Sequence, residues 1–426
     1  MIDRTIAPEF KTIEKIDIIK AQEQFLDNGI PLYTIHAGSQ ELTKVEFIFS
    51  AGMYHQNRTL LASSTNTLLE SGTTKHNALQ LSEQIDFYGS FLELEVGQDY
   101  SSVTVYSLNK YLNESLAFLE EILKDSIFPK SEIDILLANK KQKHLINSGK
   151  VSHLARRRFS ELLFGAQHPY GIDAKPEDFD TLKQSDVIDF YKNHYSFKNC
   201  FVVAAGNLPK DLHKVLNDHF GKSNWGNASA ASSKTSSITT TPERKVLVEK
   251  NDAIQSAIRI GRVLFNKTHE DYFKFQVLNT ILGGYFGSRL MANIREDKGY
   301  TYGIGSGLTS LLHSGYFYIS TEVGSDVTSK ALEEIYKEIN TLRNDLVSSE
   351  ELETVRNYIL GQFLRSVDGP FSLAEKFIAV KEFGLDYNYY TNYFNAVKHV
   401  TPNEIRDLAN KYLQEKDLIE CVAGKV

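Results

Sequence analysis

Apolar and polar positions alternate along this chain in a way that predicts short strands separated by amphipathic helices. Residues 45–50 read Val-Glu-Phe-Ile-Phe-Ser, so Val45, Phe47 and Phe49 fall on one face of the expected strand. The apolar spacing further predicts a helix through 67–70, a helix with Leu81, Ile85 and Tyr88 on one face, strands near 91–96 and 101–107, and a helix with Leu112, Leu116, Leu119 and Leu123 in one stripe.

The second half of the chain repeats this order of elements. It predicts a strand near 257–263, a helix through 273–282, strands near 303–308 and 315–322, a helix with Leu332, Ile335 and Ile339, and a further helix that Ser348 or Ser349 would cap. Each half also ends in an apolar strand that runs into glycine, at 201–206 and 418–424. The repeat predicts the α+β class, with two internally repeated domains, each a mixed β-sheet covered by helices.

Residues 227–242 separate the two halves and contain mostly serine, threonine and alanine. Such a segment buries too little apolar surface to offset the entropy of ordering, so it is expected to be a mobile linker. The predicted organisation is an N-terminal α+β domain over 1–226, the linker over 227–242, and a C-terminal α+β domain over 243–426.

Composition narrows the class of protein. The 426 residues are 42% apolar and carry a net charge of −7, which is typical of globular proteins and argues against general nucleic-acid binding. Cys200 and Cys421 lie in apolar runs and are expected as buried thiols on strands, with a disulfide or catalytic cysteine as the less favoured alternative. No stretch is long and apolar enough for a membrane span, and no leader is evident, so a cytoplasmic location is expected.

Several motifs occur together in a distinctive order. They are Phe49-Ser-Ala-Gly52, Gly72-Thr73, His168-Pro-Tyr-Gly171, Ala205-Gly206-Asn207, and a glycine-rich run from Leu282 that continues through Ile294-Arg-Glu to Gly-Tyr-Thr-Tyr302. In this order they resemble the pitrilysin/insulinase superfamily of zinc peptidases, the inverzincins. The resemblance covers nearly the whole chain and implies one half of a clamshell. It also implies that the segment at His168 is a turn without chemistry.

The resemblance fails at the metal site. Active members carry His-x-x-Glu-His on a helix, and counting back from Gly72 places this box on Ser63, Asn66 and Thr67. Hydroxyls and an amide are not zinc ligands at neutral pH, and Asn66 cannot act as a base. The third ligand, a glutamate in the family, would fall near Lys143-His144, and no acidic residue lies between Asp134 and Glu161. No metal is therefore expected on this chain, and zinc is expected only in a partner subunit.

The resemblance also implies that Arg295 and Tyr302 hold the substrate backbone and stabilise its oxyanion. A tyrosine hydroxyl and a guanidinium are suited to that task, because both donate hydrogen bonds to developing negative charge. Tyr300 is a rival to Tyr302, since alternation would place both on one strand face. Gly283 and Gly284 are expected beside the substrate channel, as hinge or close-approach glycines; a phosphate cradle is disfavoured, because the lysine of a P-loop is absent.

Other residues have plainer interpretations. From spacing alone, Arg295 would be a surface arginine paired with Glu296 or Asp297. Three histidines, His76, His144 and His153, are expected to be ordinary surface or core residues. The basic run 156–158 is expected to be a solvated helix face, with an anionic partner surface as the alternative.

The resulting hypothesis is a metallopeptidase-family subunit that is inactive alone. It would bind a peptide or unfolded polypeptide at a sheet edge and pair with a homologous zinc-bearing peptidase subunit. A non-catalytic scaffold or peptide-binding subunit is the alternative function, and an autonomous peptidase with another metal set is the least favoured. Without its partner, the chain is expected to be able to form a homodimer.

Overall fold

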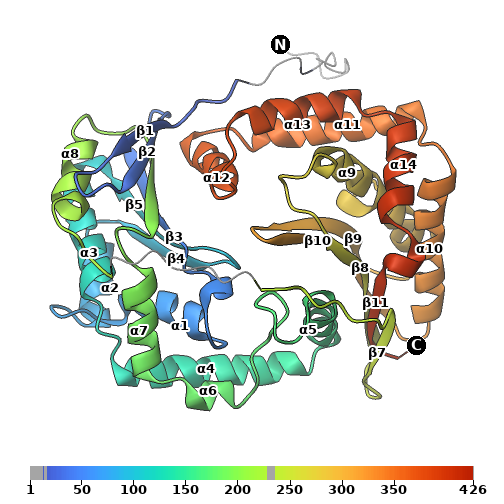
Figure 1. Ribbon diagram of the computed structural model, residues 1–426, viewed down its shortest axis with the longest axis horizontal. Helices are drawn as coiled ribbons and strands as arrows, with labels where there is room; N and C mark the ends of the chain where they lie inside the picture. The colour runs from blue at the N-terminus through green and yellow to red at the C-terminus, as the bar shows by residue number, and fades with distance from the viewer. Residues whose placement is uncertain (1–12, 14–16, 228–235, 426) are drawn as a thin grey trace, which may run out of the picture.

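The computed structural model describes residues 13, 17–227 and 236–425. Two halves lie side by side, each built on one β-sheet with helices packed against it (Figure 1). The expected α+β class, with two similar mixed-sheet domains, is confirmed.

The first half holds a six-stranded sheet in the order β1-β2-β6-β3-β5-β4. Its strands are β1 (Gln22–Phe25), β2 (Pro31–His36), β3 (Leu42–Phe49), β4 (Phe91–Val96), β5 (Ser101–Leu108) and β6 (Cys200–Gly206). The α-helices of this half are α1 (Leu61–Thr67), α2 (Ala78–Phe87), α3 (Leu112–Asp125), α4 (Lys130–Ser148), α5 (Val151–Phe164), α6 (Asp178–Thr181), α7 (Gln184–His194) and α8 (Leu212–Leu216).

The second half holds a five-stranded sheet in the order β7-β11-β8-β10-β9. Its strands are β7 (Lys245–Glu249), β8 (Gln255–Leu264), β9 (Ile304–Leu311), β10 (Ser314–Gly324) and β11 (Ile419–Gly424). Its α-helices are α9 (Tyr272–Asn279), α10 (Thr328–Asn344), α11 (Ser349–Arg365), α12 (Pro370–Lys381), α13 (Asn388–His399) and α14 (Pro402–Tyr412). Two π-helical segments, η5 (Thr280–Gly284) and η6 (Met291–Asp297), follow α9.

Strand pairing confirms the internal repeat. The order β2-β6-β3-β5-β4 in the first sheet matches β7-β11-β8-β10-β9 in the second. In each sheet the first of these pairs is parallel and the other three are antiparallel. β6 and β11 lie inside their sheets, which explains why both are buried along most of their length, although β11 includes Glu420. In the first half, α8 follows β6, so that half does not end in its strand as the sequence suggested.

Successive side chains of β3 point to opposite faces of the first sheet and belong to different hydrophobic clusters. Val45, Phe47 and Phe49 are fully buried in the main core of the first half, beneath α1, α3 and α7. Ile48 belongs to a different cluster on the opposite face of the sheet. The predicted one-sided strand thus has both faces covered.

The second layer on each sheet comes from the other half of the chain. Helix α12 packs on the first sheet, where Leu373, Ala374 and Phe377 join apolar residues of β2, β3 and β6. Helix α5 packs on β8 and β11 of the second sheet, where Phe159 and Leu163 meet residues of β11. Figure 1 shows both helices beside the sheet of the opposite half. The halves are interlocked by this exchange.

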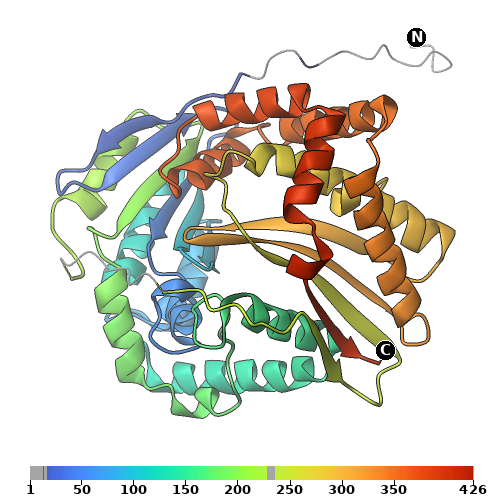
Figure 2. The same cartoon turned by 45° about the vertical axis from the view of Figure 1, so that its right-hand side comes forward.

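A hairpin makes a further contact between the halves. The β9–β10 hairpin extends from the second half toward the first (Figure 2), and the backbone N–H of Leu312 at its tip donates to Asp99 Oδ2 at 2.9 Å. The Tyr170 hydroxyl donates to the other oxygen of Asp99. Tyr170 belongs to the His168-Pro-Tyr-Gly171 segment, which forms a turn closed by backbone bonds from Gly171 and Ile172 to His168 O.

Of the predicted linker, residues 228–235 lie outside the described part of the chain. Residues 236–242 run along the first half, because the N–H groups of Thr239 and Thr241 donate to carbonyls of α5 and that of Ser236 donates to the Tyr54 hydroxyl. This part of the connection is therefore attached to the first half.

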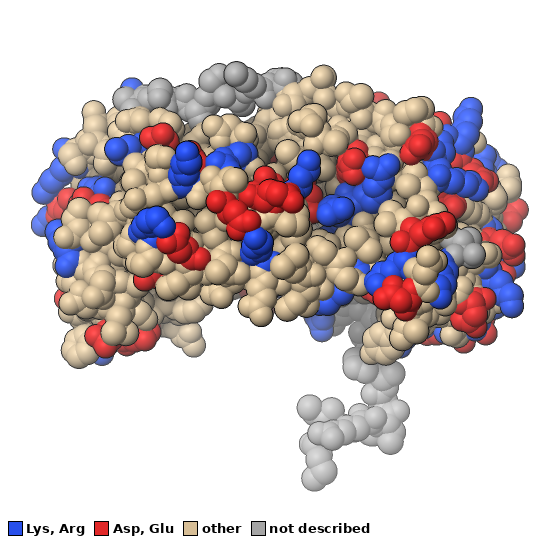
Figure 3. All heavy atoms as spheres, turned by 90° about the horizontal axis from the view of Figure 1, so that it is seen from below, with Lys and Arg blue, Asp and Glu red and all other residues tan. Residues whose placement is uncertain are grey.

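Other sequence-based expectations concern thiols, charge and membranes. Cys200 and Cys421 are buried free thiols on β6 and β11, as predicted. Basic and acidic side chains are interspersed on the face shown in Figure 3. Within the residues that the structure describes, none of the helices has the length and apolarity to cross a bilayer.

Candidate functional site

The degenerate metal box lies on α1, where the structure places Ser63, Asn66 and Thr67 on successive turns. The helix follows Leu60, whose φ of 70° lies in the left-handed region that non-glycine residues rarely adopt. Two side chains of the box bond back to their own helix: Ser63 Oγ donates to Leu60 O at 3.2 Å, and Thr67 Oγ1 donates to Ser63 O at 2.8 Å.

Asn66 points into the core rather than toward a metal. Its side chain is 1% exposed, and its Nδ2 donates to Ser102 O at 3.2 Å and to the Tyr195 hydroxyl at 3.1 Å. Its Oδ1 accepts no hydrogen bond from the described residues. The amide therefore fastens α1 to β5 and to the segment after α7, and it presents no base to solvent.

Lys140 of α4 lies against the degenerate metal box, one turn before the position predicted for the third ligand. Its Nζ lies 3.0 Å from Ser63 Oγ and 3.3 Å from Ser64 Oγ. In the described part of the chain no carboxylate forms an ion pair with it, and burial lowers the pKa of Lys140 to about 8. Sequence reasoning missed this residue because a lysine on a polar helix carries no distinguishing pattern.

The position predicted for the third ligand lies one turn beyond Lys140. The His144 ring packs against those of His153 and Phe179, with ring centroids 6.0 and 5.2 Å away. His76 instead meets Glu121, with Nδ1 2.9 Å from Oε1. No group of three His, Cys, Asp or Glu side chains suited to a metal occurs among the described residues. The hydroxyls, amide and ammonium at α1 do not fit a zinc ion.

Arg295 and Tyr302 lie together in the second half. The guanidinium carbon of Arg295 lies 5.5 Å from the Tyr302 ring centroid and 4.6 Å from that of Phe286, so the cation contacts two aromatic rings. Arg295 lies in the last turn of η6, and Tyr302 precedes β9 and is 93% exposed. Neither residue has a hydrogen bond or ion pair within the residues described, so the expected pairing of Arg295 with Glu296 or Asp297 is not found.

Tyr300 and Tyr302 do not share a strand face, contrary to the alternation argument. Both precede β9, which begins only at Ile304. Tyr300 packs partly buried against the core of the second half, whereas Tyr302 points to solvent. Extended alternation does not apply because these residues belong to the loop that leads into the strand.

The two glycines of the predicted channel differ in environment. Gly283 is buried in η5, and a Cβ there would lie 2.7 Å from the backbone nitrogen of Ser306 in β9. Gly284 is exposed. Gly283 therefore permits the close approach of η5 to β9, the strand that begins just after Tyr302.

A pocket of about 430 Å³ adjoins Tyr302. Its walls come from β8, β10 and α5, and they include Arg259, Ser320 and Glu322. Arg259 lies with its guanidinium carbon 5.7 Å from the Tyr318 ring centroid and makes no ion pair with any described carboxylate. The pocket thus offers a half-buried cation beside the exposed tyrosine.

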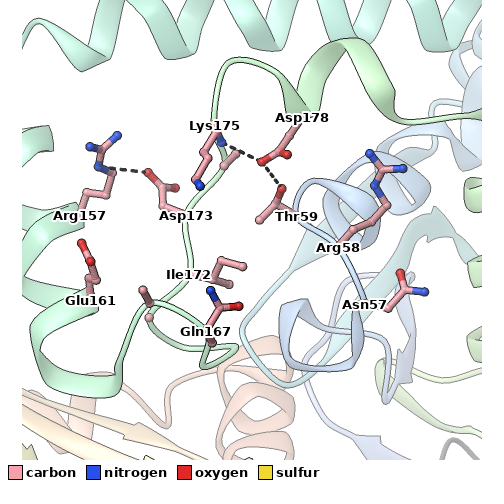
Figure 4. Close-up of a pocket in the computed structure, with 13 residues that line it drawn as sticks. Asn57, Arg58, Thr59, Arg157, Glu161, Gln167, Ile172, Asp173, Lys175 and Asp178 are labelled. Carbon is pink, nitrogen blue, oxygen red and sulfur yellow. Dashed lines mark hydrogen bonds and ion pairs between the residues drawn. The ribbon is translucent and has the colours of Figure 1, made fainter. Parts of the chain in front are cut away.

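Another pocket, of about 690 Å³, lies between α5 and the loops around residues 57–59 and 166–175 (Figure 4). Several of its charged groups already have partners: Arg157 Nε lies 3.9 Å from Asp173 Oδ2, and Asp178 Oδ2 accepts a hydrogen bond from Thr59 Oγ1 at 2.7 Å. Arg58 is paired with Asp186 at 2.8 Å. None of the predicted site residues lines this pocket.

Fold and site together define a class: a duplicated, two-sheet α+β chain whose helix α1 carries hydroxyls and an amide where the metal box was expected. Residues 181–359 match the family described as Peptidase M16 inactive domain. The expected resemblance to the pitrilysin/insulinase superfamily is thereby confirmed.

Particular relatives extend this result over most of the chain. The chain is 22% identical to "Non-peptidase homolog YmxG" of Helicobacter pylori, over 87% of this chain and 85% of that protein. It is 23% identical to "Uncharacterized zinc protease YmxG" of Bacillus subtilis, over 70% and 72%. A crystal structure of a peptidase M16 inactive domain from Pseudomonas fluorescens superposes with a TM-score of 0.86 at 18% identity, covering 95% of this chain and 98% of that one.

Proposed function

We propose that this chain is the zinc-free subunit of an M16-type peptidase. It binds a peptide and supplies Arg295 and Tyr302 to a homologous, zinc-bearing partner subunit. The observation that carries the proposal is the pairing of these two side chains, which lie together and keep their donor groups free of other described partners. The contrasting state of α1, where Asn66 is turned inward, supports a division of labour between two subunits.

The chemistry of the pair suits an acyl substrate. A phenolic hydroxyl and a guanidinium both donate to a carbonyl oxygen as it gains negative charge, and removing one such donor typically costs about 2–4 kcal/mol of transition-state stabilisation. The guanidinium carbon of Arg295 also lies 4.6 Å from the Phe286 ring centroid.

The sheet edges support peptide binding. β4 and β9 are the last strands of their sheets, and neither has a partner on its outer side among the described strands. β9 begins two residues after Tyr302, so a peptide added to that edge as a further strand would pass close to the pair. The adjoining pocket with Arg259 could receive a side chain of that peptide.

Co-expression with a zinc-bearing relative tests the proposal. Arg295→Ala and Tyr302→Phe are each expected to lower kcat for peptide cleavage by the complex about 100- to 1,000-fold, with assembly intact by size-exclusion chromatography. Arg365→Ala and Tyr358→Phe, which change an exposed arginine and a partly exposed tyrosine of α11, serve as matched controls. Unchanged cleavage in both test variants would favour the scaffold function instead.

A further inference from the structure

The most distinctive polar cluster outside the Arg295–Tyr302 pair joins α1 to α4. It consists of the Ser63 and Ser64 hydroxyls and the Lys140 ammonium, which donates to both at 3.0 and 3.3 Å. Ser64 is fully buried, whereas Ser63 is partly exposed and lies one turn before the exposed Thr67. One hydroxyl of the cluster can therefore meet a ligand from solvent while the other is held inside.

The spacing of these groups is that of a nucleophile and its base. A serine becomes nucleophilic when a neighbouring base accepts its proton, and a buried lysine is a recurrent base for serine. Ser63 Oγ and Lys140 Nζ are within direct hydrogen-bonding distance, and Ser64 Oγ provides a second contact that orients the amine. A lysine that only carried positive charge would be expected to contact a carboxylate, and none pairs with it in the described residues.

We propose that Ser63, Lys140 and Ser64 form a metal-independent acyl-transfer centre, with Ser63 as nucleophile, Lys140 as general base and Ser64 as the positioning residue for Lys140. The substrate class is a carboxylic ester with a good leaving group, because such esters need little additional stabilisation of the oxyanion. The activity requires neither the partner subunit nor zinc, so it goes beyond the proposed function and is independent of it.

The reaction balances with water as the only co-reactant. Lys140 Nζ takes the proton of Ser63 as Oγ bonds to the ester carbonyl carbon. The bond to the leaving alkoxide or phenoxide then breaks, and the leaving group takes that proton from the ammonium. Water attacks the resulting Ser63 ester and gives a proton to Lys140, which returns it to Ser63 Oγ as the acid departs. Asn66 attaches α1 to Ser102 and Tyr195 through its Nδ2.

The lowered pKa of Lys140 supports this role. Burial brings it to about 8, so part of the lysine is an unprotonated amine near neutral pH. In that state the Ser63 hydroxyl can turn from Leu60 O toward the Nζ lone pair. The contacts made to Lys140 from α1 are hydroxyls, which do not titrate in this range.

The test uses the purified full chain in excess chelator, with a fluorophosphonate probe and p-nitrophenyl acetate. We expect the probe to modify Ser63, as located by peptide mass spectrometry, and Ser63→Ala to abolish both modification and ester turnover. Lys140→Met and Lys140→Arg should each lower the labelling rate at least 100-fold, and Ser64→Ala should lower it less. The wild-type rate should rise with pH around a midpoint near 8, and this rise should be absent in Lys140→Arg. Ser148→Ala, a serine elsewhere on α4, is the matched control.

Two results would overturn the proposal. One is a Ser63 that stays unmodified while other serines react. The other is Ser63 labelling whose rate and pH dependence are the same in the folded Lys140 variants as in the wild type. Circular dichroism establishes folding of each variant. If both Lys140 variants fail to fold, the Ser63→Ala variant and the wild-type pH profile decide.

Discussion

Lys140 places a positive charge against the helix face on which zinc peptidases carry their ligands. At an effective dielectric constant of about 20, a positive charge about 4 Å away weakens the binding of a cation. The electrostatic repulsion is about 4 kcal/mol for each unit of charge on the cation. The residues of the box and this ammonium therefore both oppose metal binding. Loss of the metal site is a property of two helices, α1 and α4, and not of the box alone.

This view predicts how zinc binding could be restored. Combining Ser63→His, Asn66→Glu and Thr67→His should leave the chain without stoichiometric zinc while Lys140 remains. Adding Lys140→Glu should bring in zinc at one ion per chain, because it replaces the ammonium by a carboxylate. Elemental analysis after dialysis measures both. The triple variant with Lys140→Met separates loss of charge from gain of a ligand, and tight zinc binding with Lys140 intact would contradict the argument.

Acid sensitivity is predicted at His55, near the contact between the halves. Burial and the neighbouring His194 lower the pKa of His55 from 6.5 to about 4, while Asp99 acts in the opposite direction. Because the folded pKa is the lower one, the stability it contributes is present above pH 6.5 and is lost as the pH falls toward 4.

Urea unfolding midpoints between pH 7.5 and 5 measure this effect. His55→Gln should reduce the loss of stability on acidification by about 1 kcal/mol, after allowance for partial exposure of the ring. His399→Gln, at the exposed end of α13, should leave the pH dependence unchanged. An equal response of the two variants would show that another group governs the acid transition.

At the scale of elements, the Phe49-Ser-Ala-Gly52 motif joins β3 to the β4–β5 turn. A Cβ on Gly52 would lie 2.4 Å from the carbonyl carbon of Asp99 and 2.5 Å from the nitrogen of Tyr100. Gly52→Ala should therefore lower the free energy of unfolding by about 1–3 kcal/mol, as overpacking does. Gly361→Ala, in α11 with open space around it, should instead be neutral or stabilising by about 0.5–1 kcal/mol. Thermal unfolding compares the two, and similar midpoints would contradict the steric argument.

Elements whose pattern is local were predictable from the sequence. The strand at 91–96 coincides with β4, and Ser348 caps α11 by accepting from the Glu351 N–H at 3.1 Å. The internal repeat was predictable too, because the order of strands and helices is preserved in both halves.

Contacts between segments that are distant in the sequence could not be predicted from the sequence. The apolar stripe of α12 shows that the helix is buried on one side, yet nothing local indicates that its sheet belongs to the other half. Likewise Lys140 reaches Ser63 only because α4 crosses α1. Tyr300 and Tyr302 differ in exposure because the strand begins later than their alternation suggested.

At the scale of the whole molecule, the exchange of α5 and α12 predicts that neither half is stable alone. Residues 1–227 and 236–426, expressed separately, should aggregate, because each would expose the sheet face that the missing helix covers. Co-expressed, they should copurify as a soluble complex, detected by a tag on one fragment. A full chain cut by an inserted protease site within 228–235 should stay assembled. A soluble, cooperatively folding single half would contradict this prediction.

The exchanged helices also determine where movement can occur. Each half contributes a helix to the sheet of the other half. The two halves therefore cannot rotate apart unless both helix–sheet contacts are broken. In the two-subunit peptidase proposed above, the substrate would therefore enter by separation of the two subunits. Each subunit would then move as one rigid body.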